Sequence, residues 1–321
     1  MTSAIPAPGA HGGDGARVAA ALGLDPATVL DLSASLNPVA PDPGPVVARH
    51  LPALGRYPDP TRATAALAEV LGVERERVVL TNGGAEAIAL VGALVGGRVD
   101  EPDFSLYPRA PATDCRGDGW APAVPPRWRS DPHSPSGRSA GSDERAGVWD
   151  EAFRPLATGT WTSPPERAEA IVVGSLTKLL ACPGLRLGYL VAPATELGER
   201  LVPAVRALQP GWSVGGLACE ALPDLLAAVD LPGWCAAVSS LRSALADALR
   251  SRGLAVEAHR APWVLVGDPG GLRDGLAHQG VVVRDCASFG LPATLRIAVP
   301  DEVGRARLVG ALDRFLDPTP T

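Results

Sequence analysis

Residues 78–95 constrain the fold more than any other stretch, because a strand, a glycine turn and a helix follow one another there. Residues 78–81 read Val-Val-Leu-Thr, an apolar run that is typical of a buried strand. Asn82-Gly83-Gly84 then turns the chain, and the apolar residues at 85–95 predict a helix. A strand that leads directly into a helix is one half of a parallel α/β unit. We therefore expect a parallel sheet with helices packed on it.

Further strands and helices are predicted along the rest of the chain. Short apolar runs predict strands at residues 148–150, 171–173, 187–191, 263–266, 281–283 and 295–299. Helical patterns occur at residues 196–208, 236–252 and 302–315. The late strands lie far along the chain from the first strand and helix, which indicates a second, smaller α+β domain. We expect a large α/β domain at residues 40–222 and a small α+β domain formed by residues 1–39 and 223–321.

Residues 108–147 differ from the rest in composition. They are rich in proline, arginine, serine, glycine and aspartate and contain few aliphatic residues. Such a stretch is typical of a mobile loop rather than of a packed element. We therefore expect this part of the large domain to be loop-like.

Composition argues against several classes of protein. The chain has 321 residues, 46% of them hydrophobic, which is enough for a sizeable core. Its net charge of -6 and the lack of a basic block disfavour nucleic-acid binding. The first twenty residues contain no apolar signal-peptide core, and the longest apolar run is too short to cross a bilayer. The five cysteines form no CxxC pair, and no histidine lies at metal-ligand spacing. We therefore expect a cytoplasmic protein with reduced thiols, no metal site and no membrane partner.

Lys178 is the only lysine among the 29 lysine and arginine residues. Arginine stays protonated and is a poor nucleophile, whereas a desolvated lysine amine can lose its proton and form a Schiff base. A lysine in a chain that otherwise uses arginine therefore suggests covalent chemistry. A surface lysine without function is the alternative, so the neighbouring residues have to decide between the two.

Four features near the ends of predicted strands complement this lysine. Gly84 and Ala85 open a helix after a strand, where backbone N–H groups and the helix dipole favour a phosphate. Asp150 ends a strand and can keep a ring nitrogen protonated, while Ser175 and Arg186 flank the lysine and can bind a phosphate. Each feature alone is also explained as a helix cap, a surface cap, an ordinary serine or a solvated arginine. Together they are the parts that pyridoxal phosphate needs.

The motifs around these residues resemble those of the fold-type-I pyridoxal phosphate enzymes. The segment "SLTKLLACPGLRLGYLV" (175–191) is similar to the lysine segment of that family. Within the family, the chain resembles most the L-threonine-O-3-phosphate decarboxylases of the cobalamin pathway, and next the histidinol-phosphate aminotransferases. The other motifs follow in family order over nearly the whole chain: "HGG" (11–13), "LDLSASLNPVAP" (30–41), "RYPDP" (56–60), "TNGGAEAI" (81–88), "DEAF" (150–153), "GWSV" (211–214), "VVVRDCASFGL" (281–291) and "LRIAV" (295–299).

The resemblance implies a fold and a set of residue roles. The fold is that of a fold-type-I PLP-dependent transferase: a large domain with a mixed, mostly parallel sheet and helices on both faces, and a smaller α+β domain. Lys178 would hold the cofactor as a Schiff base. The other residues implied to contact the cofactor are Asp150 at the ring nitrogen, Phe104 stacked on the ring, Gly84, Ala85, Ser175 and Arg186 at the phosphate, and Tyr57 from the partner subunit of a homodimer. Those implied to bind the substrate are Arg296 at a carboxylate and, for a phosphate, His11 and Arg284.

The chain departs from the family pattern in a few places. Ser134 stands where the family has an asparagine that hydrogen-bonds the phenolic oxygen of the cofactor. The apolar strand before that motif is expected to be missing, because residues 125–128 read Pro-Pro-Arg-Trp. Ser35 stands where the decarboxylases usually have an asparagine near the substrate. Phe153 replaces a tyrosine of the aminotransferase branch, whereas phenylalanine is usual in the decarboxylase branch, so this position favours decarboxylation.

Three functions remain open at this level. The first is decarboxylation of L-threonine O-3-phosphate, a phosphorylated amino acid, to (R)-1-aminopropan-2-yl phosphate in cobalamin biosynthesis. The second is a histidinol-phosphate-type transamination on the same scaffold. The third is a pyridoxal phosphate-binding protein with weak or no catalysis, suggested by the altered region around Ser134.

Overall fold

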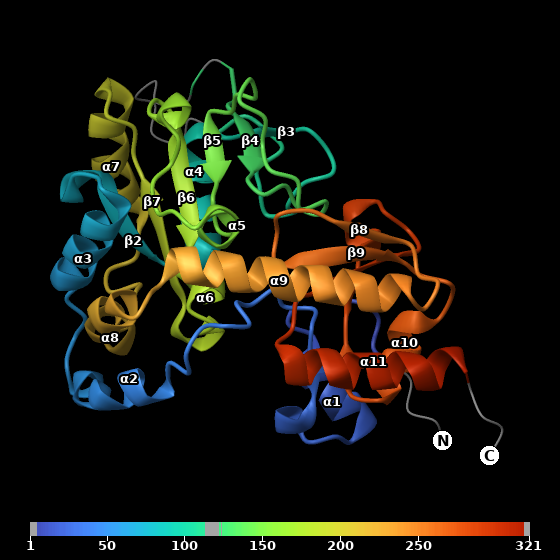
Figure 1. Cartoon of the computed structure of the whole chain (residues 1–321). Coiled ribbons are helices and arrows are strands. Elements are labelled where there is room, and N and C mark those ends of the chain that lie inside the picture. Colours follow the sequence, from blue (N-terminus) through green and yellow to red (C-terminus); the bar gives the residue numbers. More distant parts are fainter. Residues whose placement is uncertain (1–4, 113–121, 123, 318–321) are drawn as a thin grey trace. The chain divides into compact units, whose positions relative to one another are not determined.

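The computed structural model describes residues 5–112, 122 and 124–317, and the chain separates into two compact units (Figure 1). The larger unit comprises residues 40–134 and 139–235, and the smaller unit comprises residues 1–39, 135–138 and 236–321. The larger unit extends past the expected boundary at residue 222. It does so because α8 (Gly216–Ala227) packs against α2 (Gly44–Arg49) and α3 (Thr61–Leu71). The chain leaves this unit within α9 (Leu231–Arg250).

A six-stranded sheet of order β2-β7-β6-β5-β4-β3 forms the centre of the larger unit (Figure 1). The strands are β2 (Val78–Asn82), β3 (Arg98–Val99), β4 (Arg127–Ser130), β5 (Val148–Asp150), β6 (Ile171–Ser175) and β7 (Leu187–Val191). β7 is antiparallel to both of its neighbours, and the other pairs are parallel. The sheet is therefore mixed and mostly parallel, as predicted. The carboxyl ends of the other five strands meet the amino end of β7 at one edge of the sheet.

Helices pack on this sheet through buried apolar side chains. α4 (Gly83–Val95) contacts β2, β6 and β7, and α7 (Glu196–Leu208) packs beside α4. Val91 of α4 and Leu190 of β7 are fully buried in the shared core. The remaining helices of the unit are α5 (Arg154–Thr158), α6 (Leu176–Leu179), η2 (Leu51–Gly55), η3 (Arg75–Arg77), η4 (Pro165–Arg167) and η5 (Pro183–Leu185). Close packing holds the strand ends, and the side chains that follow them, in fixed positions.

β4 lies where we expected the apolar strand to be missing, and that expectation is wrong. Outside β4, the described residues at 108–147 form no helix or strand. The sequence of β4 is Arg-Trp-Arg-Ser, so a hydrophobic pattern does not reveal it. Trp128 is fully buried, and its indole N–H donates to the Gly96 carbonyl at 2.9 Å. Arg127 and Arg129 bind one carboxylate oxygen of Glu144 at 2.8 and 2.6 Å, and Arg127 also binds the Asp100 carboxylate at 2.6 Å. Because the charges are neutralised in this way, an arginine-rich strand fits between β3 and β5.

The smaller unit has a four-stranded sheet of order β11-β12-β9-β8 and a parallel pair of β1 with β10. Leu249, Val264, Ile297 and Leu308 are buried in its core. The strands are β1 (Leu30–Asp31), β8 (Val256–Ala258), β9 (Trp263–Gly267), β10 (Val281–Val282), β11 (Arg284–Asp285) and β12 (Thr294–Ala298). The helices, besides the later part of α9, are α1 (Gly15–Leu22), α10 (Leu272–His278), α11 (Glu302–Leu316), η1 (Pro26–Thr28) and η6 (Ala287–Phe289).

A search of the described residues finds no single helix that is long and apolar enough to span a membrane. Only α8 and α9 taken together meet the length and composition required, and they are bent by 84° relative to each other.

Candidate active site

Lys178 lies at the sheet edge where the parallel strands of the larger unit end. Asp150 is the last residue of β5, Ser175 is the last residue of β6, and Lys178 follows within α6. β5 and β6 are parallel neighbours, so these residues come together at that edge. The Nζ atom of Lys178 lies 5.5 Å from the centroid of the Phe153 ring, which places an apolar surface beside the amine.

A cradle for an anion is formed where α4 begins. Gly83 has a φ of 76°, and a Cβ atom built on it would lie 2.5 Å from the Arg186 Nη2 atom. A Cβ atom on Gly84 would lie 3.2 Å from the Cβ atom of Ser175. The absence of side chains at the two glycines therefore lets Ser175 and Arg186 approach the start of a 13-residue helix. Ala85 follows in the first turn, where backbone N–H groups and the helix dipole favour an anion.

Hydroxyl groups next to the lysine add to this cradle. Thr177 is buried, and its Oγ1 atom lies 2.8 Å from the Oγ atom of Ser175. Arg186 immediately precedes β7 and has a left-handed φ of 54°. The reversed direction of β7 brings this arginine to the same sheet edge as the ends of β2 and β6. A helix N-terminus, two hydroxyls and a guanidinium group make a suitable phosphate site.

Two hydrogen bonds orient the Asp150 carboxylate. The Tyr107 hydroxyl donates to Oδ2 at 2.8 Å, and the Ala152 backbone N–H donates to Oδ1 at 2.9 Å. Burial raises the pKa of Asp150, although both hydrogen bonds and the positive charge of Lys178 act in the opposite direction. A protonated ring nitrogen would also favour the ionised carboxylate, so Asp150 suits a pyridinium partner.

Tyr107 is a site residue that sequence reasoning missed. It lies 2.8 Å from Asp150, yet the two residues are far apart in the chain. The only local signal is its spacing from Phe104, which places the two rings edge to face with centroids 5.6 Å apart. Spacing of this kind predicts an aromatic contact but does not predict the distant carboxylate.

Ser134 follows β4 at the same sheet edge and is buried. Its backbone N–H donates to the Ser130 Oγ atom at 2.8 Å, and Ser130 is the β4 residue that pairs with Asp150. The Oγ atom of Ser130 in turn donates to the Asp103 carboxylate at 2.5 Å, and Asp103 directly precedes Phe104. The hydrogen bonds therefore connect the segments of Ser134, Asp150 and Phe104.

Tyr57 lies elsewhere on the larger unit and is 79% exposed. Its ring packs on that of Trp212, with centroids 4.7 Å apart, and Trp212 is 65% exposed. Leu51 and Leu54 of η2 are also exposed. Clustered exposed apolar side chains are typical of a protein–protein contact surface.

Arg284 and Arg296 are neighbours in the smaller unit. They are direct partners across β11 and β12, and both are buried. The guanidinium carbon of Arg284 lies 4.4 Å from the centroid of the Phe289 ring. That of Arg296 lies 5.8 Å from the same centroid and 4.8 Å from the centroid of the Trp263 ring. Burial, aided by the charge of Arg284, lowers the pKa of Arg296 to about 9, and burial also lowers the pKa of Arg284. Two adjacent buried cations favour an anionic ligand, because the ligand neutralises them.

The amino-terminal segment reaches Arg284. Arg284 donates from Nη2 to the Ala10 carbonyl at 3.0 Å. Burial and the charge of Arg284 lower the pKa of the adjacent His11. The Ser35 hydroxyl, in the same unit, is buried and has no hydrogen-bond partner among the described residues. A buried hydroxyl of this kind gains stability when a polar ligand supplies a partner.

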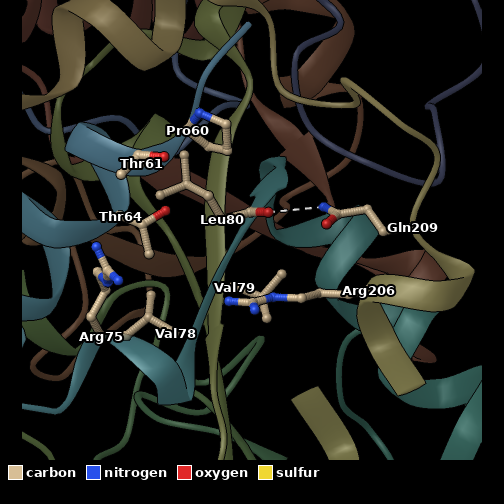
Figure 2. A pocket seen from close by; sticks show the side chains of 9 residues that line it. All are labelled: Pro60, Thr61, Thr64, Arg75, Val78, Val79, Leu80, Arg206 and Gln209. Atoms are coloured by element: carbon tan, nitrogen blue, oxygen red, sulfur yellow. Dashed lines mark hydrogen bonds between the residues drawn. The ribbon is translucent and has the colours of Figure 1, made fainter. Parts of the chain in front are cut away.

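A cavity of about 330 Å³ beside β2 does not include the lysine or the aspartate. Residues of α3, β2 and α7 line it, together with Gln209, whose amide donates to the Leu80 carbonyl at 2.8 Å (Figure 2). Gln209 also donates to Glu86 at 3.1 Å, and Glu86 accepts from the backbone N–H of Asn82 at 2.7 Å. These bonds support the turn before α4. We therefore assign the candidate site to the strand ends and not to this cavity.

The fold and the strand-end residues define a class of protein. The mixed sheet and its helices have the fold of the fold-type-I pyridoxal phosphate transferases. The residues present fit that cofactor, because an amine, an oriented carboxylate and a glycine-lined anion cradle meet at one sheet edge. The chain belongs to the aminotransferase class I and II family, whose model matches residues 147–312. The members of this family depend on pyridoxal phosphate.

Individual relatives extend the match over most of the chain. The histidinol-phosphate aminotransferase of Halorubrum lacusprofundi is 30% identical in an alignment that covers 92% of this chain and 91% of that protein. Among solved structures, the histidinol-phosphate aminotransferase from Clostridium acetobutylicum has a TM-score of 0.74 at 20% identity, covering 91% of this chain and 100% of that one. The L-threonine-O-3-phosphate decarboxylase from Porphyromonas gingivalis has a TM-score of 0.71 at 19% identity, covering 90% and 99%. At these identities the two structures establish the fold alone.

Proposed function

We propose that Lys178 binds the carbonyl carbon of pyridoxal phosphate and that Asp150 keeps its ring nitrogen protonated. The bound cofactor supplies an electron sink that weakens the bonds at the Cα atom of an amino-acid substrate. The Lys178 amine would carry protons to or from that Cα atom. The residues proposed to hold the rest of the cofactor are Gly84, Ala85, Ser175 and Arg186 at the phosphate, Phe104 on the ring and Ser134 near the phenolic oxygen.

We further propose that the reaction is decarboxylation of L-threonine O-3-phosphate to (R)-1-aminopropan-2-yl phosphate, a step of cobalamin biosynthesis. The observation that carries this proposal is the Phe153 ring, 5.5 Å from the Lys178 amine. The resemblance described above associates phenylalanine at this position with decarboxylases and tyrosine with aminotransferases. An apolar wall beside the reacting groups also favours departure of a charged carboxylate as neutral CO2.

Arg284 and Arg296 support a substrate with two anionic groups. We propose that Arg296 binds the substrate carboxylate before it leaves, and that Arg284 and His11 bind the phosphate. A phosphorylated amino acid carries both groups, so it neutralises both guanidiniums. The lowered pKa values of the two arginines express the cost of burying them together, and anion binding offsets that cost.

Transamination of histidinol phosphate is the second candidate. The curated relative quoted above carries that name and matches more than nine-tenths of this chain. In this reaction Lys178 would move the Cα proton onto the cofactor instead of protonating Cα. Both candidates use the same cofactor residues, so only the products separate them.

The holoenzyme incubated with L-threonine O-3-phosphate is expected to release CO2 and the amino alcohol phosphate in equal amounts, without a 2-oxo acid. L-Threonine is the matched control substrate. It lacks the phosphate and its charge-assisted hydrogen bonds, so its kcat/KM is expected to be lower by at least about 100-fold. Turnover of histidinol phosphate that requires 2-oxoglutarate, with no CO2 from the phosphothreonine, would support the second candidate. Bound cofactor without turnover of either compound would indicate a binding protein.

We also propose a homodimer in which Tyr57 reaches the cofactor phosphate of the partner subunit. The exposed, mutually packed rings of Tyr57 and Trp212 support it, as do the exposed Leu51 and Leu54 a few residues before Tyr57 in the chain. Sedimentation at micromolar concentration is expected to show a dimer. Tyr57→Phe, which removes only the hydroxyl, is expected to leave the dimer intact and to weaken cofactor binding about tenfold. A monomer that still binds the cofactor with wild-type affinity would contradict the proposal.

A further inference from the structure

We propose that Tyr107 is a positioning residue that holds Asp150 and Phe104 together, so that one side chain sets two contacts to the cofactor. The inference rests on the proposed roles of Asp150 and Phe104. It goes beyond those roles because it says what holds the Asp150 and Phe104 side chains in position.

Three contacts hold the Tyr107 side chain, which is only 3% exposed. Its hydroxyl donates to Asp150 Oδ2 at 2.8 Å. One face of its ring stacks on Trp128 of β4, with centroids 5.4 Å apart and an interplanar angle of 28°. Its ring also meets that of Phe104 edge to face, at 77°. Because Trp128 is fully buried, this arrangement leaves Tyr107 little freedom to move.

The turn that carries Phe104 and Tyr107 is tied to β4 independently of the two rings. Asp103 accepts hydrogen bonds from the backbone N–H of Ser130 at 3.1 Å and from the Ser130 hydroxyl at 2.5 Å. The backbone N–H of Phe104 donates to the same carboxylate at 2.8 Å. The turn is therefore already in place before any cofactor binds, and the hydroxyl of Tyr107 arrives at Asp150 preorganised.

The hydrogen bond has a defined direction. Burial, together with the negative charges of Asp150 and Asp103, raises the pKa of Tyr107 well above its ordinary value, so the hydroxyl stays protonated and donates. Among the other groups near Asp150, the charge of Lys178 favours the ionised carboxylate and that of Asp103 disfavours it. Tyr189 also lies close enough to be influenced by Asp150. The Tyr107 bond therefore helps to keep Asp150 ionised, which a pyridinium partner requires.

Tyr107→Phe is the test, because it keeps the ring stacking and removes only the donor. Cofactor affinity is measured by equilibrium titration with pyridoxal phosphate across a range of pH. Losing a hydrogen bond to a charged group is expected to weaken binding about 10- to 100-fold. The pH below which cofactor binding weakens is expected to rise, because the pKa of Asp150 rises when its hydrogen-bond donor is lost.

Tyr189→Phe is the matched control. Tyr189 is as buried as Tyr107 and lies near Asp150, but it donates no hydrogen bond to that carboxylate. The cofactor affinity of this variant and its pH dependence should therefore stay at wild-type values.

Unchanged affinity and an unchanged pH profile in Tyr107→Phe would overturn the inference, and so would equal changes in both tyrosine variants. If the wild-type protein binds no pyridoxal phosphate, the proposed function fails, and unfolding of the unliganded protein then tests the Tyr107–Asp150 bond. The folded-state pKa of Asp150 is above its unfolded value, so native stability falls as the pH rises through that interval. In Tyr107→Phe the loss of stability should continue to higher pH than in the wild type, and in Tyr189→Phe it should not. If stability depends on pH in the same way in both variants, the Tyr107–Asp150 bond does not have the proposed role.

Discussion

Replacement of Lys178 by arginine is expected to lower kcat by at least about 10⁴-fold and to abolish covalent attachment of the cofactor. The substitution keeps the positive charge and much of the side-chain length beside Phe153. It removes the ability to form a bond to the carbonyl and to exchange a proton, because the guanidinium group stays protonated. Borohydride reduction of the wild-type holoenzyme, followed by mass spectrometry, should place a pyridoxyl group on the peptide that contains Lys178. The assignment is unambiguous, because the chain has no second lysine.

Lys178→Ala separates the chemistry of the lysine from its place in the structure. If the amine acts as a proton carrier, small primary amines added to this variant should restore part of kcat, while the melting temperature stays close to that of Lys178→Arg. Activity of Lys178→Arg within about tenfold of the wild type would contradict the role of the lysine. A wild-type protein that stays colourless and unlabelled with pyridoxal phosphate present would contradict it as well.

Arg296→Met is expected to lower kcat/KM for L-threonine O-3-phosphate by about 10³-fold, because two charge-assisted hydrogen bonds to a substrate anion are lost. The same change is expected to raise the stability of the unliganded protein. Arg296 is only 5% exposed and lies opposite Arg284, so an apolar side chain of similar length removes a buried like-charge pair. A more stable and less active variant is the outcome expected of a residue kept for binding.

Unfolding of the unliganded protein gives this prediction a second measurement. Burial lowers the pKa of Arg296, which reflects the cost of holding a charged guanidinium group away from water. Because that group stays protonated in the folded protein, replacing it with an apolar side chain removes this cost. Arg296→Met should therefore unfold at a higher temperature than the wild type, whereas the exposed Arg260→Gln, in the same unit, should keep wild-type stability and wild-type kcat/KM. Equal kcat/KM values in Arg296→Met and Arg260→Gln would contradict substrate binding by Arg296.

Local chemistry along the chain was sufficient to predict several strands and helices and to place candidate residues at their ends. The strand, glycine turn and helix at residues 78–95 appear in the structure as β2 and α4, because apolar periodicity and glycine act over a few residues. Lys178 could be singled out for a similar reason: its chemistry differs from that of arginine regardless of the fold. The positions of Asp150 and Ser175 at strand ends were also readable, because parallel strands place their carboxyl ends at one edge.

Only the tertiary structure decided which distant side chains meet. The pairing of β11 with β12 places Arg284 opposite Arg296, and a shift of the register by one residue would send one of them to the other face. The sequence reading missed β4, because its two arginine charges are balanced by Asp100 and Glu144 from outside the strand, and hydrophobic patterns do not record such pairs. The Tyr107–Asp150 bond joins two segments through the packing of Trp128 between β3 and β5. Contacts of this kind depend on how the whole core closes, and no local pattern of residues encodes them.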